Sequence, residues 1–381
     1  FMCVTTMAIA TTPLAGYALL GVDKTFATLP LVLYHVGIMV TTIPASLLMA
    51  RIGRRAGFSL GALISIASGL VSTAAIFQQS FLWLSIGSFF MGASAAFAWY
   101  YRFAAADAAD EAYRPKAISL VMAGGVVAGL LGPQTAKYAV DWLEPVMFAG
   151  VYVMVAVYSM LAFVAVQGLR IPGLTVEERN AGGRPLLQIA RQPTYIVAII
   201  SSMFGYGVMT LVMSATPLAM LAYGFNFNAS ATVIQAHVVA MFLPSFFTGH
   251  LIARFGILPI IATGAFIQIG CALVNLAGIE FMNFFLANVL VGIGWNFTYV
   301  GGSSLLTKTY EPAERAKVQA SHDFLVYTTT ALAAGLSGVL HANVGWTVVN
   351  LAALPMMAIV MAAALWLYRH QARDTTPSAA G

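Results

Sequence analysis

Charged residues are scarce in this chain. Of its 381 residues only 8% are Asp, Glu, Lys or Arg, while 60% are hydrophobic. A typical soluble domain has about 25% charged residues, because its surface must interact with water. The composition therefore excludes a soluble globular protein. It also argues against nucleic-acid binding, since no basic patch interleaved with aromatic residues lies outside the hydrophobic stretches.

Cysteine and recognisable catalytic patterns are also lacking. The two cysteines, Cys3 and Cys271, both lie within hydrophobic stretches, so we expect no disulfide framework. The sequence contains no nucleophile elbow, no phosphate-binding loop and no pair of carboxylates within a hydrophobic stretch. We therefore expect neither an enzyme nor a bound cofactor.

Long hydrophobic runs, in contrast, recur from one end of the chain to the other. Each is about 18 residues or longer, enough to cross roughly 30 Å of hydrocarbon as an α-helix. We predict an all-α membrane protein with twelve transmembrane helices. The predicted spans cover residues 1–20, 28–50, 56–77, 81–103, 117–140, 146–169, 194–222, 230–252, 258–278, 281–304, 318–340 and 346–368.

The few cations indicate how these helices are oriented. With both termini in the cytoplasm, all of the 18 Lys and Arg residues except Lys24 and Lys137 lie in cytoplasmic loops or at their membrane edges. Cytoplasmic loops of membrane proteins are enriched in these residues. We therefore predict that both termini are cytoplasmic.

The chain divides into two halves at its longest polar stretch. This stretch is a predicted cytoplasmic linker at residues 170–193. It separates one six-helix bundle, residues 1–169, from a second, residues 194–368, which a cytoplasmic tail follows at residues 369–381.

The two halves repeat each other in sequence. Thr-Pro-Leu-Ala occurs at residues 12–15 and again at residues 216–219. Further pairs recur at similar offsets, namely Gly92 with Gly292 and Phe97 with Phe297. A parallel repeat of six plus six helices is typical of transporters, whose substrate binds near the membrane midplane between the halves. We therefore predict transporter architecture.

Two motifs in the second half combine soft metal ligands. Met209 and Met213 are four residues apart, as are His237 and Met241, so each pair lies on one face of a helix. Thioethers and imidazole suit copper, above all Cu(I). An ionisable residue within a membrane span is by default a functional candidate. These four residues are the predicted metal site.

Packing is the alternative explanation for these motifs. Methionine commonly fills gaps in apolar cores, and Met357 and Met361 show the same spacing, which we interpret as packing. A second His-x-x-x-Met, His35 with Met39, lies in the repeat-equivalent span of the first half. We place these two residues in a secondary candidate set together with Met7 and Met203.

Other polar and aromatic residues within spans suggest further roles. Arg102, His322 and Asp323 lie near the predicted cytoplasmic side, where they could form a gate or a proton-coupling group, or could simply reach water at helix ends. Aromatic residues gather on the fourth and tenth spans, which suits a flat organic substrate. They include the candidate cavity residues Trp99, Trp295 and Tyr299.

Two segments resemble the major facilitator superfamily of transporters. Ala50-Arg-Ile-Gly-Arg-Arg55 is similar to the superfamily's signature after the second helix, and the glycine-rich run ending at Gly132-Pro133 is similar to its fifth helix. The signature usually begins with Gly and has Asp before the Arg, whereas this chain has Ser46 and Ala50. The departure puts the usual cytoplasmic charge latch in doubt.

Within that superfamily, the Met and His motifs resemble the CcoA-like copper importers, although some relatives in that branch move riboflavin and lack the motifs. The resemblance implies import of copper as substrate across a bacterial inner membrane for assembly of haem-copper oxidases. The expected partners are the copper ion and the lipid bilayer, with no nucleic acid and a monomeric state. Two alternatives are transport of an aromatic organic solute such as riboflavin, and a copper-binding membrane sensor.

Overall fold

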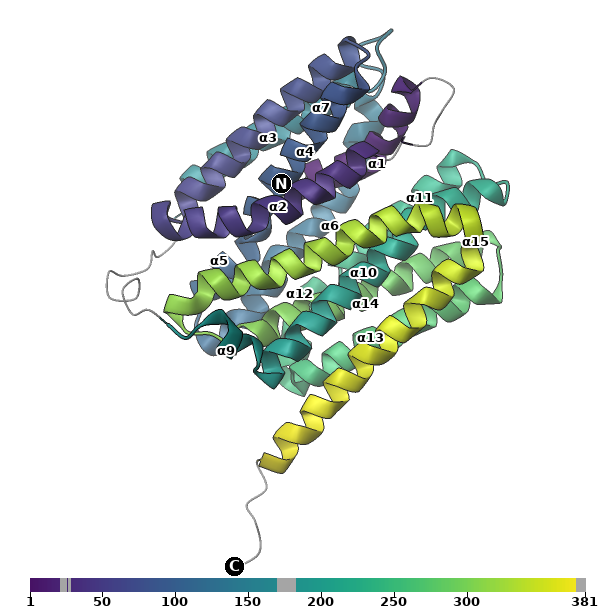
Figure 1. The fold of residues 1–381 in the computed structure, drawn as a ribbon. Coiled ribbons are helices and arrows are strands. Elements are labelled where there is room, and N and C mark those ends of the chain that lie inside the picture. The colour runs from purple at the N-terminus through teal and green to yellow at the C-terminus, as the bar shows by residue number, and fades with distance from the viewer. Residues whose placement is uncertain (21–25, 27–28, 170–182, 375–381) are drawn as a thin grey trace, which may run out of the picture. The chain divides into compact units, whose positions relative to one another are not determined.

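The chain folds almost entirely into helices. The computed structural model describes residues 1–20, 26, 29–169 and 183–374. Within these ranges twelve helical spans are long and apolar enough to cross a membrane, and no β-strand occurs (Figure 1). The prediction of an all-α fold with twelve transmembrane helices is confirmed. Lys24, part of the predicted linker (170–182) and the end of the predicted tail (375–381) lie outside the described residues.

The helices follow one another in the order that the hydrophobic runs predict. They are α1 (Met2–Leu19), α2 (Leu29–Ile52), α3 (Arg54–Phe77), α4 (Phe81–Trp99), α5 (Tyr101–Asp107), α6 (Arg114–Ala139), α7 (Ala149–Gln167), α9 (Leu186–Ala190), α10 (Pro193–Ala222), α11 (Phe227–Phe242), α12 (Ser245–Phe255), α13 (Ile257–Ala277), α14 (Phe281–Leu306) and α15 (Arg315–Asp374), with single 3₁₀ turns at Glu111–Tyr113 and Pro312–Glu314.

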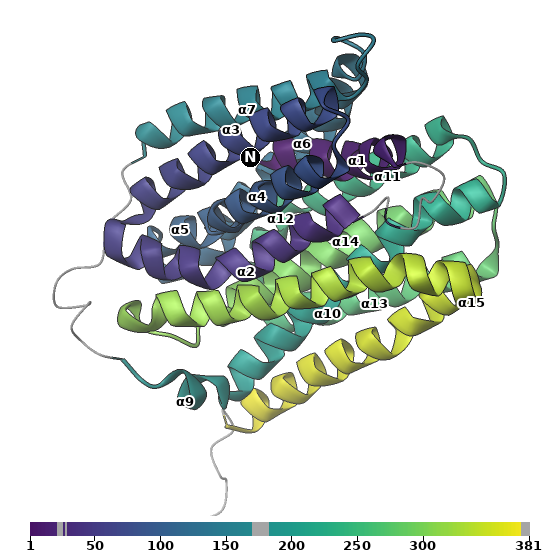
Figure 2. The same cartoon turned by 45° about the horizontal axis from the view of Figure 1, so that its top comes forward.

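Four of the spans are interrupted or joined to a neighbour. The fourth span combines α4 and α5. The eighth combines α11 and α12, which are separated at Pro244, because proline has no N–H to donate within a helix. The last two spans share α15, which reverses direction at Gly345 (Figures 1 and 2). Gly345 has φ 85°, a conformation that glycine adopts without steric cost.

Ala-Arg-x-Gly occurs at residues 50–53 and again at residues 253–256, and both segments adopt the same backbone turn. Gly53 follows α2 with φ 86°, and Gly256 follows α12 with φ 89°. Each glycine is also the residue before the next helix, α3 or α13. A side chain at either position would strain the turn. The sequence repeat is therefore also a repeat of local structure.

Two compact units make up the structure, and each is described by itself. The first contains residues 1–108, 124–182 and 312–331, and the second contains residues 109–123, 183–311 and 332–381. They follow the predicted halves except that 109–123 groups with the second unit and 312–331 with the first. The predicted division at residues 170–193 stays a prediction.

In the first unit, α4 packs against α2 and α3, and α3 packs against α7 (Figures 1 and 2). Small residues allow the close approach. A Cβ atom at Gly92 would overlap the carbonyl oxygen of Tyr34 on α2, and one at Gly61 would meet the Cβ of Phe97 on α4. Small residues at helix interfaces are how membrane helices reach van der Waals contact of their backbones.

The second unit repeats this packing around α14, which contacts α10, α11 and α13. A Cβ at Gly264 would meet the Cβ of Phe297, and a Cβ at Gly292 would lie 2.8 Å from the carbonyl oxygen of His237 on α11. These glycine and phenylalanine positions are repeat-equivalents of those in the first unit. The packing places α14 at the centre of the residues described next.

Candidate functional site

An aromatic cluster forms where α10, α11 and α14 meet in the second unit. Trp295 and Tyr299 are one helical turn apart on α14 and stack, with ring centroids 5.1 Å apart and planes 18° apart. Tyr206 from α10 contacts both edge-on, at 5.3 and 5.2 Å. Phe242 from α11 meets the Trp295 ring edge-on at 5.6 Å. All four are buried, so three helices build one aromatic wall.

Two buried amide side chains belong to the same unit, Asn296 on α14 and Gln268 on α13. The Asn296 amide donates to the carbonyl of Met241 and to the hydroxyl of Ser245, and its oxygen accepts from Thr248 at 2.7 Å. The Gln268 amide donates to the carbonyl of Gly205 at 3.2 Å. Asn296 is thus fixed by its neighbours, and α11, α12 and α14 are tied together through it.

Two polar atoms here have no hydrogen-bond partner among the described residues. They are Nε1 of Trp295, a donor, and Oε1 of Gln268, an acceptor. A buried polar atom without a partner costs about 1–3 kcal/mol. A ligand with its own donors and acceptors can satisfy such atoms.

His237 is held from the neighbouring helix. It is fully buried, and its Nδ1 lies 2.8 Å from the carbonyl oxygen of Asn288 on α14. A carbonyl only accepts, so Nδ1 carries the hydrogen and Nε2 presents a lone pair. Nε2 has no hydrogen-bond partner among the described residues.

The four predicted metal ligands all lie in the second unit. Met209 and Met213 are on α10, the first buried and the second half-buried, and His237 and Met241 are buried on α11. Gly292 of α14 packs against the backbone of both His237 and Met241, so this face of α11 also serves helix packing. Their assignment as metal ligands stays a prediction.

The secondary set is split between the two units. His35, Met39 and Met7 lie in the first unit and Met203 in the second. Nδ1 of His35 donates to the carbonyl of Leu31 in its own helix, at 2.9 Å. The histidines of the two repeat-equivalent spans therefore differ, because of these two only the His237 side chain is bonded to another helix.

A second polar cluster, in the first unit, joins α5 to the start of α15. Arg102 Nη2 lies 2.5 Å from Asp323 Oδ1, and His322 Nδ1 lies 2.7 Å from the same oxygen. All three side chains are buried. The structure thus brings together the three residues that the sequence suggested as a gate or coupling group. They do not reach water at helix ends.

Trp99 belongs to this second cluster. Its carbonyl accepts from Arg102 Nη1, and its ring lies 6.0 Å from that of Tyr327 and edge-on to Phe1 at 5.7 Å. The three candidate cavity aromatics are therefore divided, with Trp99 in the first unit and Trp295 and Tyr299 in the second.

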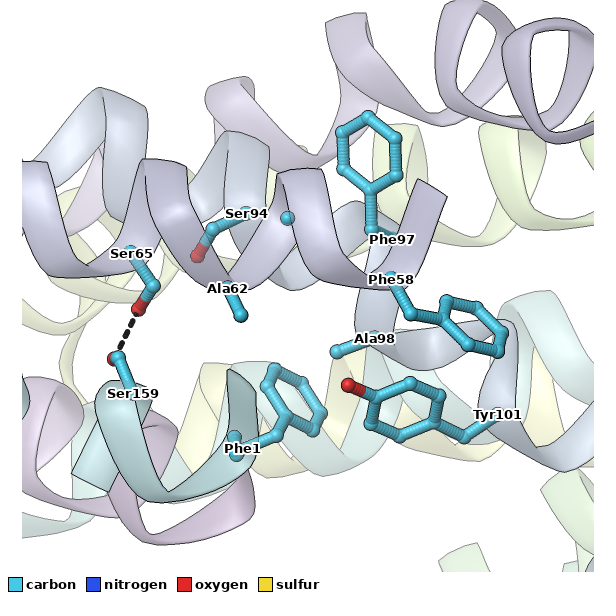
Figure 3. A pocket seen from close by; sticks show the side chains of 11 residues that line it. Phe1, Phe58, Ala62, Ser65, Ser94, Phe97, Ala98, Tyr101 and Ser159 are labelled. Atoms are coloured by element: carbon cyan, nitrogen blue, oxygen red, sulfur yellow. Dashed lines mark hydrogen bonds between the residues drawn. The ribbon is translucent and has the colours of Figure 1, made fainter. Parts of the chain in front are cut away.

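A small cavity opens beside Phe1 in the first unit (Figure 3). Phe1, Phe58 and Tyr101 line one end and the hydrogen-bonded hydroxyls of Ser65 and Ser159 the other. Its volume is about 20 Å³, the room that one water molecule needs. An organic solute does not fit there.

The signature segment after the second helix forms a latch despite its departures from the usual pattern. Arg54 Nη2 lies 2.7 Å from Asp107 Oδ2 and 3.0 Å from the Gln319 amide oxygen. Ser46, in place of the usual glycine, donates to the carbonyl of Ala316 at 2.9 Å. The first unit therefore ties α2 and α3 to α15 without an Asp at position 50.

Sequence reasoning missed Tyr206, Phe242 and Gln268. The signal for Gln268 was present, since it is one of two amides, with Asn275, inside the hydrophobic run 258–278. Nothing in the sequence distinguishes Tyr206 or Phe242 from other aromatic residues of the spans. Their role depends on contact with Trp295, which only the packing of three helices creates.

Comparison with known proteins identifies the family. The profile of the Major Facilitator Superfamily matches residues 1–280. The chain belongs to the major facilitator superfamily. Solved members share the fold, among them FucP in the outward conformation (TM-score 0.71, 15% identity, 96% of this chain and 97% of that chain) and the human organic anion transporter MFSD10 (TM-score 0.74, 12% identity, 95% and 96%).

Relatives with higher sequence identity are bacterial transporters. The riboflavin transporter RfnT of Brucella anthropi is 39% identical over 345 residues, which cover 90% of this chain and 86% of that protein. The uncharacterized MFS-type transporter YdeG of Bacillus subtilis is 28% identical over 93% of this chain and 86% of that protein.

The interpretation of this chain as a copper importer is wrong. The resemblance to the superfamily is confirmed, but the relative at 39% identity is a riboflavin transporter and not a CcoA-like importer. Neither copper as the substrate nor a role in oxidase assembly is supported any longer. The physical reason is that i, i+4 spacing places two side chains on one helix face whether that face binds a metal or packs against a neighbour.

Proposed function

We propose that this protein transports riboflavin or a closely similar flavin. The observation that carries the proposal is the 39% identity to a riboflavin transporter over 90% of the chain. The aromatic cluster of the second unit supports it. The flavin ring system is flat and aromatic, and its pyrimidine edge carries both hydrogen-bond donors and acceptors.

The stacked pair Trp295 and Tyr299 has the chemistry to bind such a ring. Aromatic rings prefer offset-stacked or edge-to-face contacts, and Tyr206 already takes the second arrangement against both. The unpartnered donor of Trp295 is complementary to an acceptor on the flavin edge. The cluster contains no charged side chain, as suits an uncharged solute.

We further propose uptake across a bacterial cytoplasmic membrane with both termini in the cytoplasm. The bacterial relatives and the distribution of Lys and Arg support this orientation. A reporter enzyme fused after Gly381 tests it, because alkaline phosphatase is active only outside the cytoplasm. An active phosphatase fusion contradicts the orientation.

The test of function is riboflavin uptake by liposomes that contain the purified protein. We expect uptake above that of empty liposomes, and Trp295→Ala to weaken riboflavin binding by about 10–100-fold, the loss of about 1–3 kcal/mol of stacking. Trp83→Ala is the matched control, since Trp83 is 49% exposed at the start of α4. Equal losses in both variants, or no uptake by the unaltered protein, contradict the proposal.

A further inference from the structure

Helices α10, α11 and α14 meet a second time, about two turns of α14 before Trp295. His237 on α11 donates from Nδ1 to the carbonyl of Asn288 on α14, at 2.8 Å. The Asn288 amide donates in turn to the hydroxyl of Thr216 on α10, at 3.1 Å, and to the carbonyl of Phe284. His237, Asn288 and Thr216 are all 0% exposed. A polar contact thus joins the three helices that also build the aromatic wall.

Two acceptor atoms in this contact have no hydrogen-bond partner among the described residues. They are Nε2 of His237, whose hydrogen is on Nδ1, and Oδ1 of Asn288, whose amide nitrogen already donates twice. A buried polar atom without a partner costs free energy, and such an atom in a native structure calls for an explanation. Both atoms can only accept, so the group that complements them is a donor.

The contacts between the helices do not require these two acceptors. The bond between α11 and α14 uses Nδ1 of His237 and a backbone carbonyl, and the bond from α14 to α10 uses the Asn288 amide nitrogen. Nε2 and Oδ1 take part in neither bond. Polar side chains within membrane spans are expensive and commonly serve the path of a substrate. A role in binding therefore explains the two acceptors better than a role in packing.

The polar contact and the aromatic wall lie in register along the same two helices. Asn288 and Trp295 are seven residues apart on α14, which places them on one face of the helix and about 10 Å apart along its axis. The order on α11 is the same, because His237 meets Asn288 and Phe242, five residues later, meets Trp295. One elongated molecule can therefore reach both the aromatic wall and the two acceptors.

Riboflavin has such an elongated shape. Its flat ring system carries a ribityl side chain, a linear carbon chain with a row of hydroxyl groups, and each hydroxyl can donate a hydrogen bond. We propose that His237 Nε2 and Asn288 Oδ1 accept hydrogen bonds from the ribityl hydroxyls while the ring lies against Trp295. This inference rests on the proposed function, and it adds the orientation of the solute and the residues that select for its hydroxyl chain.

Access to the two acceptors depends on the contact between α11 and α14. The helices touch at Gly292, where an added Cβ would lie 2.8 Å from the carbonyl oxygen of His237. The solute reaches the acceptors when α11 moves away from α14 at this contact. The break between α11 and α12 at Pro244 is where the span can bend, because proline leaves a gap in the hydrogen bonds of a helix.

Two substitutions of His237 separate its structural bond from its unpartnered acceptor. In His237→Asn the side-chain nitrogen lies near the position of Nδ1, so the bond to the Asn288 carbonyl is kept and the acceptor at Nε2 is lost. In His237→Gln the longer side chain places its amide oxygen near the position of Nε2, so the acceptor is kept and the bond at Nδ1 is lost. His250→Asn is the matched control, because His250 is an exposed histidine on α12.

The measurement compares riboflavin with lumiflavin, which has the same ring system and a methyl group in place of the ribityl chain. Quenching of flavin fluorescence gives the affinity of detergent-purified protein for each, with a metal chelator present. We expect a preference for riboflavin of about tenfold for each acceptor, equivalent to about 1.4 kcal/mol. His237→Asn should lower this preference by about tenfold and change lumiflavin binding by less than about twofold. His237→Gln and His250→Asn should keep the preference.

The outcomes distinguish the hydroxyl-binding role from the proposed function. Equal binding of the two flavins by the unaltered protein overturns the role of the two acceptors and leaves flavin transport standing. An equal loss of both flavins in His237→Asn shows that His237 acts only through structure, which also overturns it. Binding of neither flavin contradicts the proposed function and this inference together. The comparison of the two flavins on the unaltered protein decides the question even where a variant fails to fold.

Discussion

The end of α4 and the equivalent end of α14 differ in chemistry although their packing is the same. Phe97 and Phe297, 200 residues apart, each press their Cβ against a glycine of the preceding helix. Five residues further on, α5 has Arg102 in an ion pair with Asp323, whereas α14 has Gly302 packed on Ser202 and Ala198. The repeat preserves the positions where backbones touch and leaves the neighbouring positions free to diverge.

The two regions therefore bury different kinds of side chain. The first unit gathers charge, with Arg102, His322 and Asp323 within hydrogen-bonding distance. The second unit gathers uncharged aromatic and amide groups around Trp295. A duplicated scaffold can therefore hold an ion-paired cluster in one region and an uncharged aromatic cluster in the other.

The largest expected effect comes from breaking the ion pair of the first unit. Arg102→Ala leaves the Asp323 carboxylate buried without its cation, which costs about 3–5 kcal/mol. We expect a lower thermal unfolding midpoint in detergent and a lower yield in the membrane. The double variant Arg102→Leu with Asp323→Leu removes both charges and should recover most of the loss. A single variant as stable as the unaltered protein contradicts the assignment.

At the equivalent site in the second unit, Gly302, the stability of the protein should depend on side-chain volume instead of charge. At Gly302 a Cβ would lie 3.0 Å from the carbonyl oxygen of Ala198 and overlap the hydroxyl of Ser202. Gly302→Ala should therefore destabilise the protein by about 1–3 kcal/mol. Gly335→Ala is the control, since open space surrounds that position, and it should leave the unfolding midpoint unchanged or raise it. The same unfolding measurement compares the two.

Flavin binding should distinguish the repeat-equivalent aromatics Trp99 and Tyr299. Tyr299→Ala removes the stacking partner of Trp295 and should weaken riboflavin binding by about tenfold, or about 1.4 kcal/mol. Trp99→Ala should change binding by less than about twofold, well under 1 kcal/mol. Quenching of riboflavin fluorescence on titration with protein measures both. The reverse order of effects would place the flavin surface in the first unit.

The smallest expected effect concerns the methionine pair on α10. Met213 is half-buried and lies outside the stacked cluster, so Met213→Ala should leave riboflavin uptake within about twofold of the unaltered protein, a change below 0.5 kcal/mol. Uptake by liposomes with equal amounts of each protein provides the measurement. A loss as large as that of Trp295→Ala would show that the thioether takes part in the solute site.

The sequence by itself determined the twelve helices. Whether a segment can cross the bilayer as a helix depends on its own length and hydrophobicity, which are local properties. The repeated glycines at positions 53 and 256 were visible as well, since their turn depends on one residue's backbone freedom. The superfamily followed from the same local motifs. The prediction of copper import from the Met and His spacing was wrong. That spacing shows which side chains share one helix face, but not which groups of the neighbouring helices they contact.

Only the tertiary structure decided which side chains act together. Tyr206 and Phe242 gain a role by contact with Trp295, from helices that the chain reaches 89 and 53 residues earlier. Arg102 meets Asp323 across 221 residues, so their sharing of one oxygen with His322 has no signature in local pattern. Local sequence sets where helices form, whereas ion pairs and aromatic stacks depend on the side chains that packing brings within a few ångströms.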